Sequence, residues 1–111
     1  MKQRVMSGGG GMQEIVRQAA RLQRKMEQAR EEVKDVEVEA TGAGGKVKAV
    51  VTCGGQVKRL ELDESFAKEE GFEFALAALA AAVNSAFEAA EKQTEEHVSK
   101  ATGGLKLPTG F

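Results

Sequence analysis

Two side chains of this sequence could serve as a nucleophile, a base or a metal ligand near neutral pH: the single cysteine, Cys53, and the single histidine, His97. Cys53 ends a segment of alternating residues, on its apolar side, so we expect a buried structural thiol. His97 follows Glu95 and Glu96, which predicts a solvated side chain. A zinc site needs about four ligands, which one copy of this chain does not supply. We therefore expect no enzyme, and no catalytic residue, metal, cofactor or small-molecule substrate.

The most suggestive group of residues is cationic. Arg17, Arg21 and Arg24 recur at steps of four and three, and Lys25 stands four residues after Arg21, so they line one side of a helix. We expect this row to flank the apolar stripe of that helix. Such cations suit DNA phosphates, because each contact releases condensed counterions. The competing interpretation is an ordinary charged face with exposed ion pairs, such as Arg17 with Glu14.

Two more cations are weaker candidates for DNA contact. Lys92 and Lys100 belong to a later predicted helix, where four glutamates surround them: Glu88, Glu91, Glu95 and Glu96. The sequence contains no Trp and no Tyr, so it offers no strong aromatic platform for stacking bases. Any nucleic-acid binding should therefore rest on the phosphate backbone, with weak recognition of base sequence.

The charge of the chain is distributed unevenly. The net charge is −1, from 16 basic and 17 acidic residues, which by itself argues against attraction to nucleic acid. Residues 1–34, however, hold eight basic and four acidic side chains, residues 35–62 hold four of each, and residues 63–111 hold four basic and nine acidic. The N-terminal third is therefore net cationic, and the C-terminal part net anionic.

The first predicted element is a long helix over residues 12–35. Its apolar residues recur at steps of three and four and form one stripe: Met12, Ile15, Ala19, Leu22, Met26, Ala29, Val33 and Val36. A helix of this length measures roughly 36 Å, longer than so small a core can cover. Part of the stripe should therefore meet another chain.

A flexible arm is expected before this helix. Residues 1–11 end in Gly8–Gly11, and four glycines lose much conformational entropy on ordering. A phosphate-binding loop would need a preceding strand and a following Lys-Ser or Lys-Thr, and both are missing. We expect residues 1–11 to form the arm and residues 12–111 to form a single domain.

An antiparallel meander of three strands follows the helix. Residues 36–41, 46–53 and 56–62 alternate in the manner of half-buried strands. Gly42–Gly45 predicts the first turn, and Gly54–Gly55 predicts a two-residue hairpin turn. In the third strand Val57 falls out of phase with Leu60 and Leu62, which predicts a bulge or a register shift.

The second long helix is predicted over residues 72–100, after a polar loop at residues 63–71 that includes a short helical turn. Its Ala-rich first half lets several elements approach closely. Since the chain is poor in bulky side chains, we expect a dimer whose interface uses Leu76, Leu79, Val83 and Phe87. Gly103 should end the helix, and the apolar tail beyond it suggests docking. No apolar run approaches 20 residues, so we expect neither a membrane span nor a membrane partner.

Several local patterns together resemble a known family. They are, in chain order, Met12, Gln13, Gln18, Gln23 and Met26 of the first helix, the run Gly42–Val47, Gly54, the strand end Leu60–Asp63, and the closing run Thr102–Phe111. In this order and spacing they make residues 12–111 resemble the YbaB/EbfC family of bacterial nucleoid-associated proteins. Glu64 departs from the proline that many members carry after the aspartate.

The resemblance carries expectations about fold and function. It implies an α+β protein that forms an intertwined, tweezer-like homodimer with helical arms on a shared core. It implies binding of double-stranded DNA in the cytoplasm, at the nucleoid, and a genetic association with recombination and replication-clamp-loading genes. The matching motifs are structural turns, so the choice of Arg17, Arg21, Arg24 and Lys25 rests on charge spacing. The alternative function is a protein–protein adaptor of the recombination or replication machinery, without direct DNA binding.

Overall fold

The computed structural model describes the backbone of residues 2–104 and the side chains of residues 11–104. Its elements, in chain order, are α1 (Lys2–Val33), β1 (Glu37–Gly42), the short 3₁₀ turn η1 (Ala43–Gly45), β2 (Val47–Thr52), β3 (Val57–Leu62), α2 (Glu64–Glu70) and α3 (Phe72–Ala101). The strands form one antiparallel sheet in the order β1-β2-β3. The predicted α+β order of helix, three-stranded meander and long helix is confirmed.

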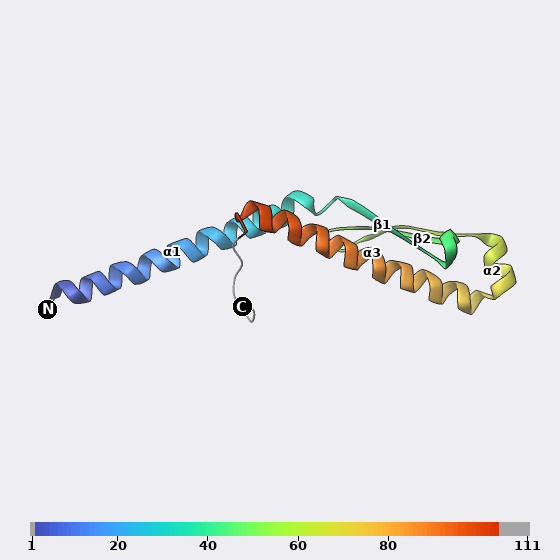
Figure 1. Cartoon of the computed structure of the whole chain (residues 1–111), viewed down its shortest axis with the longest axis horizontal. Coiled ribbons are helices and arrows are strands. Elements are labelled where there is room, and N and C mark those ends of the chain that lie inside the picture. The colour runs from blue at the N-terminus through green and yellow to red at the C-terminus, as the bar shows by residue number, and fades with distance from the viewer. Residues whose placement is uncertain (1, 105–111) are drawn as a thin grey trace.

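The molecule is a rod rather than a globule. It measures 81 × 23 × 18 Å, and its radius of gyration is 22.0 Å, whereas a compact chain of this length would have about 13 Å. Figure 1 shows the cause: α3 lies along the sheet, while α1 continues far beyond it. The expected helical arm is therefore present in α1.

The start of α1 differs from the expected boundary. The helix begins at Lys2 and includes Gly8–Gly11, which the sequence placed in an arm before the helix. Glycine costs about 1 kcal/mol relative to alanine inside a helix, so this stretch has low intrinsic helix propensity. The flexibility of residues 1–11 stays a prediction.

The sheet contains the predicted irregularity in β3. Val50 pairs with Arg59, whereas the next residue of β2, Val51, pairs with Val57, so Lys58 is an extra residue in β3. Because of this extra residue, Val57 lies opposite Val51 and shares a face of the sheet with Leu60 and Leu62, although it is out of phase with them in the sequence. The predicted bulge is confirmed.

The β2–β3 turn is not the two-residue turn expected from Gly54–Gly55. The Thr52 amide donates to the Gln56 carbonyl at 2.8 Å, and the Gly55 amide donates to the Thr52 carbonyl at 3.0 Å. Of the two glycines only Gly55 has a positive φ, 97°. These features define a three-residue loop whose last residue is left-handed, a common hairpin connection.

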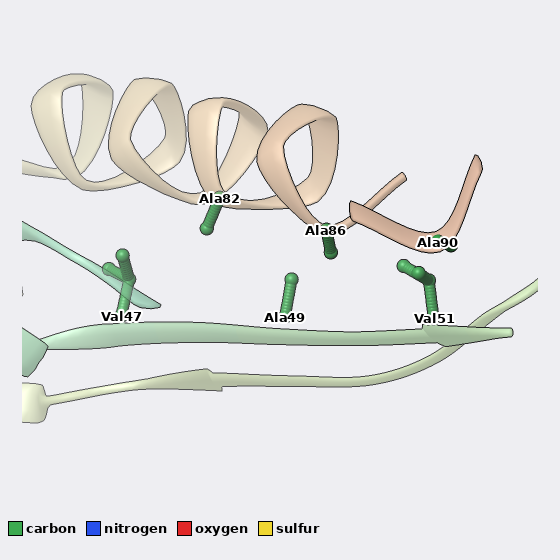
Figure 2. Packing of buried hydrophobic residues seen from close by; sticks show 6 residues of the cluster. All are labelled: Val47, Ala49, Val51, Ala82, Ala86 and Ala90. Atoms are coloured by element: carbon green, nitrogen blue, oxygen red, sulfur yellow. The ribbon is translucent and has the colours of Figure 1, made fainter. Parts of the chain in front are cut away.

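Alanines bring α3 against the sheet. Ala49 of β2 and Ala86 of α3 are both fully buried, and they point toward each other in Figure 2. Around this contact one helix face meets alternate residues of β2; the six residues are Val47, Ala49, Val51, Ala82, Ala86 and Ala90. Because four of the six are alanines, the core is thin, as the composition predicted.

A short helix links the sheet to α3. The Phe66 amide donates to the Asp63 carboxylate at 2.8 Å, which caps the first turn of α2. Phe66 and Phe74 stack edge to face, with ring centroids 6.0 Å apart. The short helical turn predicted in this polar segment is confirmed, although it extends to Glu70.

The length and composition of α3 correct one expectation. Contrary to the prediction from apolar runs, this helix is long and apolar enough to cross a membrane by those two measures. Core helices of water-soluble proteins pass the same test. One face of α3 packs on the sheet, and its second half carries four glutamates, so we assign it to the core.

Candidate nucleic-acid interface

The apolar stripe of α1 is buried at one end only. Ala29 and Val33 are buried, Leu22 and Met26 are half-buried, and Met12 remains 64% exposed. The buried end of α1 packs against α3. The helix therefore leaves the core near Leu22, and the arm before that point carries its side chains into solvent, as its length predicted.

The base of this arm is fixed by polar contacts. The Gly54 amide donates to the Lys34 carbonyl at 2.9 Å, and the Cys53 amide donates to the Val36 carbonyl at 3.0 Å. A Cβ at Gly54 would lie 2.7 Å from the Lys34 carbonyl oxygen, so the loop can approach this closely only with glycine. The hairpin loop thus holds the chain where α1 ends.

A side-chain contact joins α1 to α3 at the same place. His97 Nε2 lies 2.8 Å from Glu32 Oε1, and both side chains are partly exposed. The sequence predicted a solvated histidine and missed this partner, which is 65 residues away. Just after α1 ends, Lys34 pairs with Glu31, and this hydrogen bond raises the pKa of the lysine.

The four candidate cations of α1 are all exposed: Arg17, Arg21, Arg24 and Lys25. A guanidinium nitrogen of Arg17 lies 3.7 Å from Glu14, the expected ion pair. Among the side chains of residues 11–104, the ion pairs do not include the other three cations. An exposed pair at this spacing contributes only about 0.3–0.5 kcal/mol, so DNA phosphates could displace it.

Two of these cations border the apolar stripe on one side. Arg21 and Lys25 line an open groove of about 440 Å³, whose apolar floor is formed by Ile15, Ala19 and Leu22. Gln18 and Thr102 complete the lining, so the groove begins where α3 ends. The predicted flanking position is confirmed for Arg21 and Lys25.

The other two cations lie elsewhere around the helix. Arg17 borders a shallow hollow with Met12 and Val16, and it follows Ile15 by two residues, about 160° around the helix from that side chain. Arg24 follows Leu22 by two residues, which places it about 160° around the helix from that side chain. The expectation that all four flank the stripe is therefore wrong for Arg24 and, by the same spacing from Ile15, for Arg17. The cations cover a broad face of the arm rather than one line.

The lysines of α3 lie in acidic surroundings. Lys92 and Lys100 are exposed, and Glu96 stands one helical turn from each of them. Glu88 is one turn from Lys92 on the other side. The α3 lysines are therefore less favourable to a polyanion than the α1 cations.

A second exposed surface is apolar. Leu76, one of the four predicted interface residues, is 50% exposed. The other three, Leu79, Val83 and Phe87, are half-buried and pack against the core.

Further exposed apolar side chains lie outside the predicted interface residues. Leu60 is 49% exposed and Phe72 is 69% exposed, and Phe74 and Val57 are also open to solvent. The cause is the position of α3, which packs mainly on β1 and β2 and leaves β3 largely uncovered. Sequence analysis did not assign these four residues to the interface, although the phase of Leu60 and Leu62 indicated an inward-facing pair.

The remaining chemistry-bearing groups form no compact site. Cys53 is half-buried against the core, in the loop after β2, rather than fully buried as expected. Among the described residues no three His, Cys, Asp or Glu side chains gather closely enough to hold a metal ion. Within this part of the chain, the exposed cationic arm is the feature that best suits a ligand.

Comparison with known proteins agrees with the resemblance inferred from the sequence. The uncharacterized protein HP0035 from Helicobacter pylori has a similar fold: it is 22% identical, the match covers 70% of this chain and 90% of that chain, and the TM-score is 0.58. The YbaB/EbfC DNA-binding family matches residues 8–105, which include the cationic arm, the sheet and α3. The chain therefore belongs to the YbaB/EbfC DNA-binding family.

Proposed function

We propose that this protein binds double-stranded DNA as a homodimer, mainly through phosphate contacts of α1 and with little sequence preference. The observation that carries the proposal is a helix with four exposed cations that stands clear of the core: Arg17, Arg21, Arg24 and Lys25. Membership of a DNA-binding family supports binding rather than catalysis.

The charges of the two long helices favour α1 as the contacting element. Residues 14–30 of α1 hold five basic and two acidic side chains, whereas residues 88–100 of α3 hold two basic and four acidic ones. A duplex is therefore attracted to α1 and repelled by the second half of α3. Lys92 and Lys100 make at most minor contacts in this proposal.

The spacing of the cations suits the DNA backbone. Arg17 and Arg24 are seven residues apart, a distance of about 10 Å along the helix axis. This distance corresponds to about three base-pair steps of 3.4 Å. Because the arm presents long cationic side chains and no tryptophan or tyrosine, its contacts carry little information about base sequence.

The exposed apolar surface supports the dimer. Leu60, Phe72, Phe74 and Leu76 are exposed apolar side chains that a second copy related by two-fold symmetry could cover. The predicted residues Leu79, Val83 and Phe87 are half-buried against the core. A dimer would present two cationic arms, and these could bridge or compact DNA and so affect gene expression in the bacterial cytoplasm, at the nucleoid.

The proposal is tested by equilibrium binding of the purified protein, freed of nucleic acid, to duplexes of unrelated sequence. We expect similar affinity for each duplex at moderate salt, and a dimer mass by light scattering. The double substitution Arg17→Glu with Arg21→Glu should weaken duplex binding while the dimer stays folded. Binding that is unchanged in this variant would reject the α1 surface.

The exposed stripe favours a second candidate function. Met12, Ile15 and Val16 are more than half exposed, as in a helix that binds a partner helix. A protein–protein adaptor of the recombination or replication machinery would then use the charges for solubility alone. The same titration separates the two functions, since an adaptor would not bind any of the duplexes.

A further inference from the structure

The end of α3 forms a turn beside the groove of α1. The Gly104 amide donates to the Ser99 carbonyl at 2.8 Å, and the Gly103 amide donates to the Lys100 carbonyl at 3.2 Å. This pair of hydrogen bonds is a Schellman motif, and it confirms the predicted helix stop. Thr102 lines the groove, so the chain leaves α3 at one end of an open apolar surface.

The following segment has the length and composition to cover that surface. Residues 105–111, outside the described part of the chain, read Leu-Lys-Leu-Pro-Thr-Gly-Phe. Pro108 cannot continue a helix and disfavours the helical conformation at Leu107. Side chains alternate in an extended segment, so Leu105 and Leu107 would share a face and Lys106 would point the other way.

The distances are compatible. Seven extended residues span about 23 Å, whereas the groove floor from Leu22 to Ile15 spans about 10 Å along α1. The two leucines would stand about 7 Å apart, which lies between the rise of about 6 Å from Ile15 to Ala19 and that of about 10 Å from Ile15 to Leu22. The tail can therefore reach the whole groove from its anchor at Gly104 without moving α3.

We propose that residues 105–111 dock in extended form into the groove of their own α1, with Leu105 and Leu107 against Ile15, Ala19 and Leu22. The tail then covers the part of the apolar stripe that α3 does not reach. Arg21 and Lys25 line the same groove. They would repel the α1 arm of a second copy, because that arm carries the same cations. The short tether from Gly104 favours the chain's own tail over that of a second copy.

Disulfide trapping in the full chain tests the location. In a Cys53→Ser background, Thr109→Cys is combined with Gln18→Cys, in the groove, or with the matched control Arg24→Cys, on another side of α1. We expect the Gln18 pair to form an intramolecular disulfide at least about tenfold faster than the Arg24 pair, a ratio that partial burial of one leucine can supply. Adding Leu105→Asp and Leu107→Asp should abolish this ratio, whereas Lys106→Ala should preserve it.

The following outcomes would contradict docking of residues 105–111 on their own α1. Equal rates for the two pairs would mean that the tail has no preferred site on α1. Disulfides that form only between chains, in a mixture of Gln18→Cys chains and Thr109→Cys chains, would mean that the tail docks on a second copy. Hydrogen exchange gives an independent measurement: the aspartate variant should lose protection of α1 amides at residues 15–22, and unchanged protection would also count against docking.

Discussion

The salt dependence of DNA binding gives a quantitative prediction about α1. In the proposed dimer, four cations on each of two arms would make about eight phosphate contacts, so log K should fall with log salt at a slope near −7. Replacing Arg17→Ala and Arg21→Ala removes about four of these contacts and should reduce the slope to about −3.6. Between 50 and 200 mM salt, wild-type affinity would then fall by about four decades, and that of the variant by about two.

Replacing Arg17 and Arg21 by alanine should leave the arm folded. Both arginines are exposed, and alanine has the highest helix propensity. The lost ion pair between Arg17 and Glu14 is an exposed one, worth at most about 0.5 kcal/mol. The circular dichroism spectrum and the dimer mass should therefore match those of the wild type.

A matched control removes the same charge from the other helix. Lys92→Ala with Lys100→Ala also deletes two cations per chain, but from the acidic part of α3. Fluorescence anisotropy of a labelled duplex, titrated at several salt concentrations, measures all three slopes. The reasoning is refuted if the α3 variant lowers the slope as much as the α1 variant, because binding would then follow net charge and not position.

Three further predictions concern the dimer, the core and the base of the arm. Leu76→Asp should shift the protein toward monomer in sedimentation experiments, since burying leucine contributes about 1.5–3 kcal/mol per chain; an unchanged dimer would exclude this surface. Ala86→Leu should destabilise the fold by about 1–3 kcal/mol in urea unfolding, whereas exposed Ala89→Leu should have little effect; equal effects would contradict the close helix–sheet contact. Gly54→Ala should lower the free energy of unfolding by about 1–3 kcal/mol, through its clash with the Lys34 carbonyl, and wild-type stability would show that the loop can move aside.

Local periodicity predicted the elements well because each depends on near neighbours. Alternation located all three strands, and the phase of Leu60 against Val57 located the bulge. The length of the apolar stripe of α1 predicted a helix that extends beyond the core, and the rod-like shape of the molecule confirms this prediction. The geometry of the β2–β3 turn was harder, because two adjacent glycines permit several loops and the hydrogen bonds of Thr52 select among them.

Contacts between elements that are distant in the sequence could not be predicted from local periodicity. The contact of His97 with Glu32 depends on how α3 packs against α1. The spacing of residues along the sequence does not determine that packing. The exposure of Phe72 likewise follows from the placement of α3 over β1 and β2. For the candidate site, both the exposure of the four α1 cations and their spread around the helix follow from their spacing, since Arg24 is two residues from Leu22, whereas the groove that Arg21 lines beside Thr102 depends on where α3 ends.

Because α1 is anchored at its last turn, a small tilt there displaces the far end of the helix. From Ala29, the outermost fully buried residue of the apolar stripe, to Met12 the axis runs about 25 Å. A tilt of about 10° at the base would move Met12 by about 4 Å, slightly more than one base-pair rise of 3.4 Å. In the proposed dimer, small adjustments around Gly54 and Glu32 would therefore set the distance between the two arms, and with it the width of the duplex face that the arms can contact.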